Sequence, residues 1–227
     1  MSLRSHFLPT TGPGLGAGVL APLGFLLAYL AVSPLADALA DRPLPLPGGP
    51  AAEVAAYYAA NPAAITTTAV LQVVSVACFA VFVGGLAPAL RAAGAGWLPR
   101  VGYLSAAAMV VSSALSMTLL ALSLSAGDST VAALRQANFL AGGLVNVVLL
   151  GVFVFGAALV LGRDLLFGKP TRWFGFVAGT LAMLSVLSLA FYYANAFLPI
   201  GRVLSMVWTV VAGIVIYRRV RAELAGR

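Results

Sequence analysis

The chain has 227 residues, of which 62% are hydrophobic and only 8% are charged. A soluble domain carries about 25% charged residues, so this composition excludes a water-soluble globule and a disordered chain. The net charge of +7 does not by itself indicate nucleic acid, because the basic residues flank apolar runs. We interpret the charge as a record of topology and of contact with lipid headgroups, and we expect no nucleic-acid partner.

Six apolar runs approach or exceed the roughly 20 residues that a helix needs to cross the bilayer. They cover about 15–36, 64–88, 101–125, 137–162, 173–197 and 198–217. None shows the strict alternation that a membrane β-barrel strand requires. The sequence therefore predicts an all-α, polytopic bundle of six transmembrane helices that forms a single domain over residues 1–227.

The distribution of basic residues predicts the orientation of the bundle. With the N-terminus in the cytoplasm, ten of the thirteen basic residues lie on the inner side, and only Arg42, Arg135 and Arg202 lie outside. This is the asymmetry expected of short cytoplasmic loops. We predict an N-in, C-in protein of a bacterial plasma membrane. The first apolar run follows Arg4 and is longer than a usual signal-peptide core, so we expect a retained first helix.

The first outer loop is long and has a helical segment of its own. Residues 41–50 are rich in Pro and Gly, and Pro50 precedes a stretch from Ala51 to Ala60 that ends before Asn61 and Pro62. Pro favours the start of a helix and disfavours helix in the residue before it. We predict a short helix at the outer interface, with Tyr57 and Tyr58 at the level of the lipid headgroups.

Polar residues inside the predicted spans form stripes at helical spacing, and most lie in the outer half of the membrane. The stripes include Thr68, Gln72 and Ser75; Asn138, Gly142 and Asn146; Ser185, Ser188, Tyr192 and Asn195; and Arg202, Ser205 and Thr209. Two interpretations remain open. The side chains either hold helices together or line a cavity that is open outward and closed inward. A continuous channel is disfavoured, because it would need polarity throughout.

Arg135 and Arg202 are the most informative single residues, because an unpartnered guanidinium is costly inside a membrane protein. Three interpretations are open: an ion pair with Asp37 or Glu53, extension toward the outer headgroups, or recognition of an anionic ligand group. Asp37 is the acid closest to the membrane on that side.

Catalytic and metal-binding patterns are not apparent in the sequence. The chain has one histidine and one cysteine, and no span pairs two carboxylates. These counts exclude a Ser–His dyad within the spans and a thiolate metal cluster. We expect no catalytic residues, no metal and no cofactor.

Three segments carry a family resemblance. They are AAEVAAYYAANPAAITTTAVLQVVSVACFAVFVGGLAPALR (51–91), RQANFLAGGLVNVVLLGVFVFGAALV (135–160) and LPIGRVLSMVWTVVAGIVIYRR (198–219). Together they resemble the domain of unknown function 4386 type, a set of uncharacterised bacterial, notably actinobacterial, integral membrane proteins. The resemblance implies a multi-span helical protein and transfers no activity and no functional residue.

The favoured functional hypothesis is a non-enzymatic binder of a small or amphipathic molecule in an outward cavity, serving transport or sensing. The candidate ligand-binding residues are Gln72, Arg135, Asn138, Asn146, Ser188, Tyr192, Asn195 and Arg202. Two alternatives remain: a structural or assembly subunit that contacts a membrane partner or a second copy, and an intramembrane enzyme that uses the outer acids.

Overall fold

The computed structural model describes residues 14–45, 49–163 and 166–225, and within these ranges every regular element is a helix. The long helices are α1 (Gly14–Leu30), α4 (Pro62–Ala92), α5 (Leu98–Leu122), α7 (Asn146–Arg163), α8 (Lys169–Leu184) and α9 (Phe197–Ala225). The shorter ones are α2 (Val32–Leu39), α3 (Ala51–Ala60) and α6 (Asp128–Asn138). A π-helix, η2 (Phe139–Val145), joins α6 to α7, and two 3-10 turns, η3 (Ser185–Leu189) and η4 (Tyr192–Ala196), follow α8.

Six of the described helical segments are long and apolar enough to cross a membrane, which confirms the predicted multi-pass bundle. They are Gly18–Leu39, Pro62–Ala92, Leu98–Leu122, Asp128–Gly162, Lys169–Leu189 and Ala194–Ala222. Pro residues stand in the first turns of α4, α5 and α8, where no helical N–H is lost. Large apolar side chains such as Leu27, Val81, Leu104 and Val177 are exposed, as expected for lipid contact. The chain is a multi-pass integral membrane protein.

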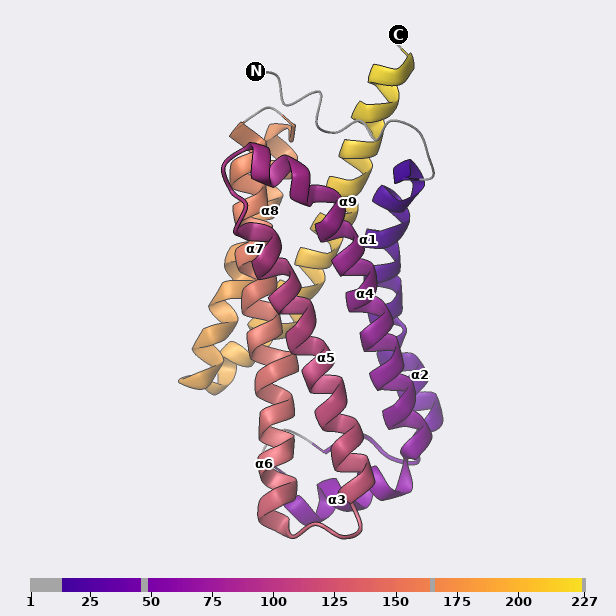
Figure 1. Cartoon of the computed structure of the whole chain (residues 1–227). Helices are drawn as coiled ribbons and strands as arrows, with labels where there is room; N and C mark the ends of the chain where they lie inside the picture. The colour runs from indigo at the N-terminus through magenta and orange to yellow at the C-terminus, as the bar shows by residue number, and fades with distance from the viewer. Residues whose placement is uncertain (1–13, 46–48, 164–165, 226–227) are drawn as a thin grey trace.

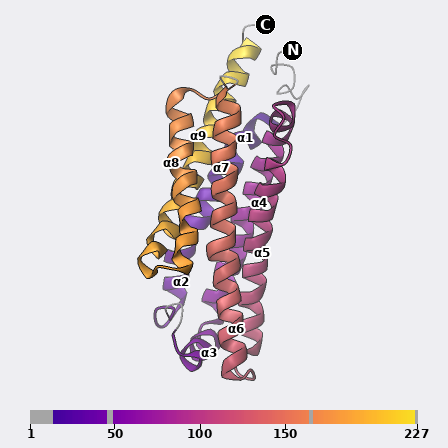
Figure 2. The same cartoon turned by 90° about the vertical axis from the view of Figure 1, so that its left-hand side faces the viewer.

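The spans form a closed ring, in which α1 contacts α4, α4 contacts α5, α5 contacts α7, α7 contacts α8, α8 contacts α9 and α9 returns to α1. The start of α1 and the end of α9 lie at the same end of the bundle, and α3 and α6 lie at the other (Figures 1 and 2). We call these the termini end and the α3 end. A shared end for the start of α1 and the end of α9 agrees with an even number of spans.

Aromatic side chains fill the middle of the ring. Phe25 stacks on Phe79 with ring centres 4.8 Å apart, and Phe79 meets Phe153 edge-on at 5.5 Å. Further toward the termini end, Phe167 meets Trp208 edge-on at 5.6 Å. These rings belong to one large buried cluster to which α1, α4, α5, α7, α8 and α9 contribute. The interior of the bundle is therefore a packed apolar core at this level.

The predicted outer helix is confirmed as α3, but the prediction for its tyrosines is wrong. Tyr57 and Tyr58 are 4% and 1% exposed, in a second buried cluster that includes Leu119 of α5 and Val131 of α6. Helix α3 therefore uses these two tyrosines, which were expected to face headgroups, to pack against α5 and α6. Burial raises the pKa of the Tyr57 phenol above its ordinary value, Asp37 and Tyr58 raise it further, and Arg135 opposes the shift.

The fifth span differs from the sequence prediction at its α3 end. Helix α8 stops at Leu184, and η3 and η4 follow as separate 3-10 turns on either side of Ala190 and Phe191. Ser185 donates a hydrogen bond back to the Ala182 carbonyl (2.6 Å). The predicted α-helical stripe of Ser185, Ser188, Tyr192 and Asn195 is therefore wrong, because these residues do not share one continuous α-helix.

Glycines permit the closest helix contacts. Around Gly175, an added Cβ would lie 2.6 Å from the Trp208 Nε1 atom and 2.5 Å from the Ala158 Cβ atom. At Gly179, it would lie 2.8 Å from the Gly151 carbonyl oxygen. The G-x-x-x-G spacing on α8 thus serves tight helix packing.

We expect Gly179→Ala to lower the free energy of unfolding by about 1–3 kcal/mol, because the added methyl group must displace the backbone of α7. Gly85→Ala is the matched control. Gly85 is exposed on α4 with no atom within 4 Å of an added Cβ, so this change should be neutral or stabilising by up to about 1 kcal/mol. Thermal unfolding in detergent checks both, and equal melting temperatures would contradict the packing assigned to Gly179.

Candidate functional site

Nine residues from five helical segments surround a cavity of about 130 Å³ in the half of the bundle nearer the α3 end. They are Gln72 on α4, Met109 and Ser112 on α5, Arg135 and Asn138 on α6, Phe139, Gly142 and Gly143 on η2, and Arg202 on α9. Cavities that enclose whole drug-sized molecules measure about 300–1,000 Å³. This one, which we call the two-arginine cavity, fits a small polar group.

Arg202 reaches from the second turn of α9 across to η2. Its Nη2 group donates to the carbonyl oxygens of Gly142 and Gly143, and its Nη1 group donates to the Tyr29 hydroxyl (3.1 Å). The guanidinium also lies 5.3 Å from the centre of the Tyr29 ring, which adds a cation–π attraction. Its Nε–H is buried and has no hydrogen-bond partner. One donor of this cation therefore remains unsatisfied beside the cavity.

Arg135 approaches the same cavity from the last turn of α6. Its Nη2 group donates to the Pro45 carbonyl oxygen (3.2 Å), in the loop before α3, and its Nε–H is again buried without a partner. The cavity wall thus holds two guanidinium groups, each with one unused buried donor.

The ion-pair interpretation of the two arginines does not match the structure. Asp37 and Glu53 are exposed, and the hydrogen-bond acceptors of both guanidinium groups are backbone carbonyls and a phenol. Among the described residues, neither arginine forms an ion pair with a carboxylate. The residues that line the cavity also include no carboxylate. The positive charge of the cavity is therefore uncompensated by its own walls.

Arg202 donates to two backbone carbonyls of the π-helix η2. In a π-helix the backbone hydrogen bonds join residues five apart instead of four, and such turns are frequent at functional sites. The Gly143 carbonyl also accepts from the Asn146 N–H. Gly142 also brings η2 against α5, because a Cβ at this position would overlap the Ser112 side chain. Only glycine allows this approach without a shift of one of the helices.

Asn138 holds α6 to α5 at the edge of the cavity. Its Nδ2 group donates to the Ser112 carbonyl (2.7 Å) and to the Ser116 hydroxyl (2.6 Å), while the Ser112 hydroxyl donates to the Asn138 carbonyl (3.1 Å). The Ser113 hydroxyl donates to Gln72 Oε1 (3.3 Å). The amide of Asn138 is thus already engaged, and it positions the turn on which Arg135 and η2 lie.

Asn146, also predicted as a ligand-binding residue, lies outside the cavity lining. It is buried and donates to the Ser105 carbonyl (2.9 Å) and hydroxyl (3.2 Å), and the Ser105 hydroxyl donates to the Asn146 carbonyl (2.8 Å). This reciprocal arrangement satisfies both side chains between α5 and α7. Asn146 therefore acts as a helix clamp here.

The structure brings together half of the predicted ligand-binding residues, namely Gln72, Arg135, Asn138 and Arg202. Ser188 and Asn195 lie on η3 and η4 outside the lining, and the Ser188 hydroxyl is buried without a partner. Tyr192 lies on η4, and its side chain is outside the described part of the structure. Sequence reasoning missed Tyr29, although it is a lone tyrosine in the first apolar run.

The chain matches no protein-family model, no curated protein and no solved structure. The resemblance to the domain of unknown function 4386 type thus stays a prediction.

The roles assigned to the two asparagines can be separated by mutation. We expect Asn146→Ala to lower the free energy of unfolding by about 1–2 kcal/mol, because it removes the clamp to Ser105, and to leave the two-arginine cavity intact. The control is Thr118→Ala, which removes an exposed hydroxyl bonded within its own helix. Chemical denaturation in detergent measures both, and a loss of the same size in the control would refute the clamp.

Proposed function

We propose that this protein is a non-enzymatic binder of a small or amphipathic anion in a bacterial plasma membrane. The two-arginine cavity receives the anionic group from the outer side, and binding serves transport or sensing of that molecule. The single observation that carries this proposal is a cavity lined by two guanidinium groups with unused buried donors and no carboxylate.

The charge of the cavity supports an anion as the ligand. Burying a guanidinium without a counter-charge costs several kcal/mol after relaxation, and carbonyl dipoles offset only part of that cost. An oxyanion placed between Arg135 and Arg202 would supply the missing charge. It would accept charge-assisted hydrogen bonds from guanidinium N–H groups at the cavity wall. Phosphate, sulfate, sulfonate and carboxylate groups share this chemistry.

The size and surroundings of the cavity support an amphipathic molecule. At about 130 Å³ the cavity accommodates the charged group and not a large attached body. Met109 and Phe139 contribute apolar wall beside the polar residues. A ligand that places its oxyanion between the arginines would therefore leave an apolar remainder against helices and lipid.

The chemistry of the lining supports binding over catalysis. The lining residues carry no thiol, imidazole or carboxylate, so they supply neither a nucleophile with its base nor a general acid–base pair. Among the described residues, no group of three or more His, Cys, Asp and Glu side chains is placed to hold a metal ion. The arginines and Gln72 are recognition groups.

Arg135→Gln tests the proposal most cleanly, because its one described hydrogen bond is to the Pro45 carbonyl. We expect the wild-type protein in a nonionic detergent to bind dodecyl phosphate and not dodecyltrimethylammonium in calorimetric titrations. Arg135→Gln should weaken dodecyl phosphate binding by about tenfold or more, the value of a charged hydrogen bond. Arg202→Gln should weaken it as well, and should also lower the melting temperature through its lost bonds to η2.

The control is Arg100→Gln, which removes an exposed arginine near the start of α5, at the termini end. Its affinity for dodecyl phosphate should equal that of the wild type. The proposal is wrong if the wild type binds both amphiphiles equally or binds neither, or if Arg100→Gln weakens binding as much as Arg135→Gln. A stoichiometric membrane partner in place of any bound anion would instead favour the assembly-subunit alternative.

The proposed orientation predicts that the termini end faces the cytoplasm. A green fluorescent protein fused after Arg227 should therefore fluoresce, and alkaline phosphatase at the same position should be inactive. Fusions in the loop between α5 and α6, at Gly127, should give the opposite pair of results. An active phosphatase after Arg227 would place the two-arginine cavity on the cytoplasmic side and refute the outward-facing site.

A further inference from the structure

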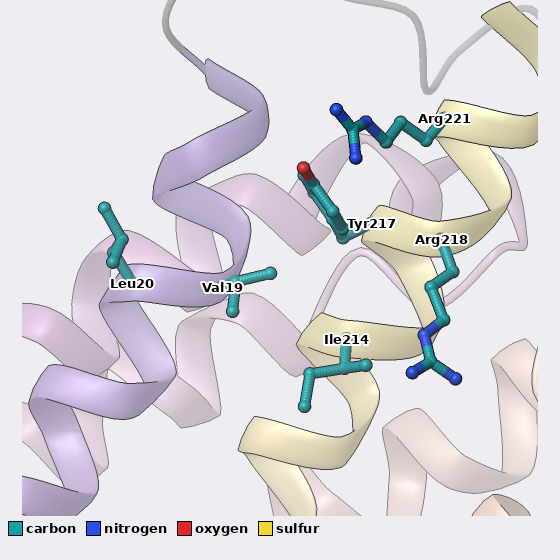
Figure 3. A pocket seen from close by; sticks show the side chains of 6 residues that line it. All are labelled: Val19, Leu20, Ile214, Tyr217, Arg218 and Arg221. Carbon is teal, nitrogen blue, oxygen red and sulfur yellow. The ribbon is translucent and has the colours of Figure 1, made fainter. Parts of the chain in front are cut away.

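A second hollow lies at the opposite end of α9 from the two-arginine cavity. It is a groove of about 690 Å³ between α1 and α9, lined by Val19, Leu20, Ile214, Tyr217, Arg218 and Arg221. Figure 3 shows Val19 on α1 directed toward α9, and Tyr217 and Arg221 on α9 extending toward α1. We call this the termini-end groove. Three of its residues are aliphatic and two are arginines, so it combines an apolar wall with positive charge.

The groove arises from the way α1 and α9 cross. At Gly213, an added Cβ would lie 2.5 Å from the Gly18 carbonyl oxygen and 2.9 Å from Pro22 Cγ, so the two backbones are nearly in contact there. A Cβ at Gly18 itself would meet no atom within 4 Å. Tyr217 follows one turn beyond Gly213 on α9, and its larger side chain lies in the gap between α9 and α1. The close crossing at Gly213 therefore narrows the gap between the two helices beside the groove.

The level of the groove in the membrane follows from the length of α9. Sixteen residues separate Arg202 from Arg218, which is about 24 Å along an α-helix. The hydrocarbon core of a bilayer is about 30 Å thick. If Arg202 lies near one interface, Arg218 and Arg221 lie near the other. The aliphatic wall of Val19 and Ile214 then lies at acyl-chain depth, and the Arg221 guanidinium lies at headgroup depth. The Arg218 side chain runs back along α9 toward the level of Ile214 (Figure 3).

The two arginines are arranged differently. The Arg221 guanidinium stacks over the Tyr217 ring at 5.7 Å from its centre, and Figure 3 shows it above the ring on the α1 side, whereas Arg218 extends away from it along α9. Both arginines are exposed. Stacking fixes the Arg221 side chain but leaves its donors directed to the surroundings. A headgroup phosphate in the groove would meet these donors and the Tyr217 hydroxyl, while Arg218 adds positive charge from further away.

We propose that the termini-end groove is a binding site for one anionic phospholipid of the adjoining leaflet, which is the cytoplasmic leaflet in the proposed orientation. The headgroup phosphate binds at Arg221 beside Tyr217, Arg218 adds positive charge nearby, and an acyl chain lies along Val19 and Ile214. Basic pockets between transmembrane helices bind anionic headgroups in this way. The proposal rests on the groove alone and does not depend on a ligand in the two-arginine cavity.

The test is native mass spectrometry of the detergent-solubilised full chain, titrated with phosphatidylglycerol or with phosphatidylcholine of the same acyl chains. The wild type should retain one phosphatidylglycerol molecule in preference to phosphatidylcholine. Arg221→Gln should weaken phosphatidylglycerol binding about fivefold, which corresponds to the contribution of one basic residue near a membrane surface, and Arg218→Gln should weaken it by a smaller factor. Because both residues are exposed, unchanged melting temperatures should accompany these losses.

The matched control is Arg219→Gln, which removes an exposed arginine between the two that lies outside the groove lining. It should bind phosphatidylglycerol as the wild type does. Equal binding of the two lipids, or an equal loss in Arg219→Gln, would overturn the site and leave only diffuse attraction to a basic helix end. Glycerol phosphate binding as tightly as phosphatidylglycerol would also overturn it, because the apolar wall would then contribute nothing.

Discussion

The half of the bundle nearer the α3 end is constrained by the free-energy cost of placing a guanidinium group among apolar helices. Arg202 is placed among helices that otherwise bury aliphatic and aromatic side chains, and no carboxylate of the described chain neutralises it. Its partners are instead the carbonyls of Gly142 and Gly143 in the π-helix η2 and the Tyr29 hydroxyl. Dipoles satisfy most of its donors without cancelling its charge, so the site keeps its attraction for an anion.

The neutral polar residues have a different role from the charged ones. Ser105 and Asn146 bond to each other, Asn138 bonds to Ser112 and Ser116, and the Ser75 hydroxyl donates to the Phe25 carbonyl (2.7 Å). Each of these contacts joins two helices, as the interpretation of polar residues as helix contacts predicted. The two-arginine cavity therefore differs from these contacts in that its positive charge is not neutralised. Asn138, at the edge of the cavity, holds the helical turn that forms part of the cavity wall.

The two hollows lie near opposite ends of α9, with the aromatic core between them. The rings of Phe25, Phe79 and Phe153 are in mutual contact within a cluster that reaches Trp208. This arrangement separates a polar site nearer the α3 end from a basic groove at the termini end. Both sites contain arginines. Backbone carbonyls hold Arg135 and Arg202 in the first site, and the Tyr217 ring holds Arg221 in the second.

Apolar run length was sufficient to predict the six spans, and Pro50, Asn61 and Pro62 were sufficient to predict helix α3. Helical spacing also placed Gln72, Arg135, Asn138 and Arg202 on suitable faces, and the structure gathers these four around one cavity. The prediction from helical spacing failed at Ser188 and Asn195, because no sequence signal marked the break of α8 after Leu184. It failed for the tyrosines of α3 because their burial depends on Leu119 and Val131, which are distant in sequence.

The π-helix was equally hidden from sequence reasoning. The carbonyls of Gly142 and Gly143 meet Arg202, which lies 60 and 59 residues further along the chain. Long-range partners of this kind are set by tertiary packing, which single-helix periodicity does not contain.

The most direct measurement of the central claim is a crystal structure of the protein soaked in selenate, an oxyanion whose selenium is located by anomalous scattering. The account predicts an anomalous peak between the guanidinium groups of Arg135 and Arg202, within hydrogen-bond distance of guanidinium nitrogens of both. A cavity without that peak, with the carboxylate of Asp37 or Glu53 bonded to either arginine, would contradict it.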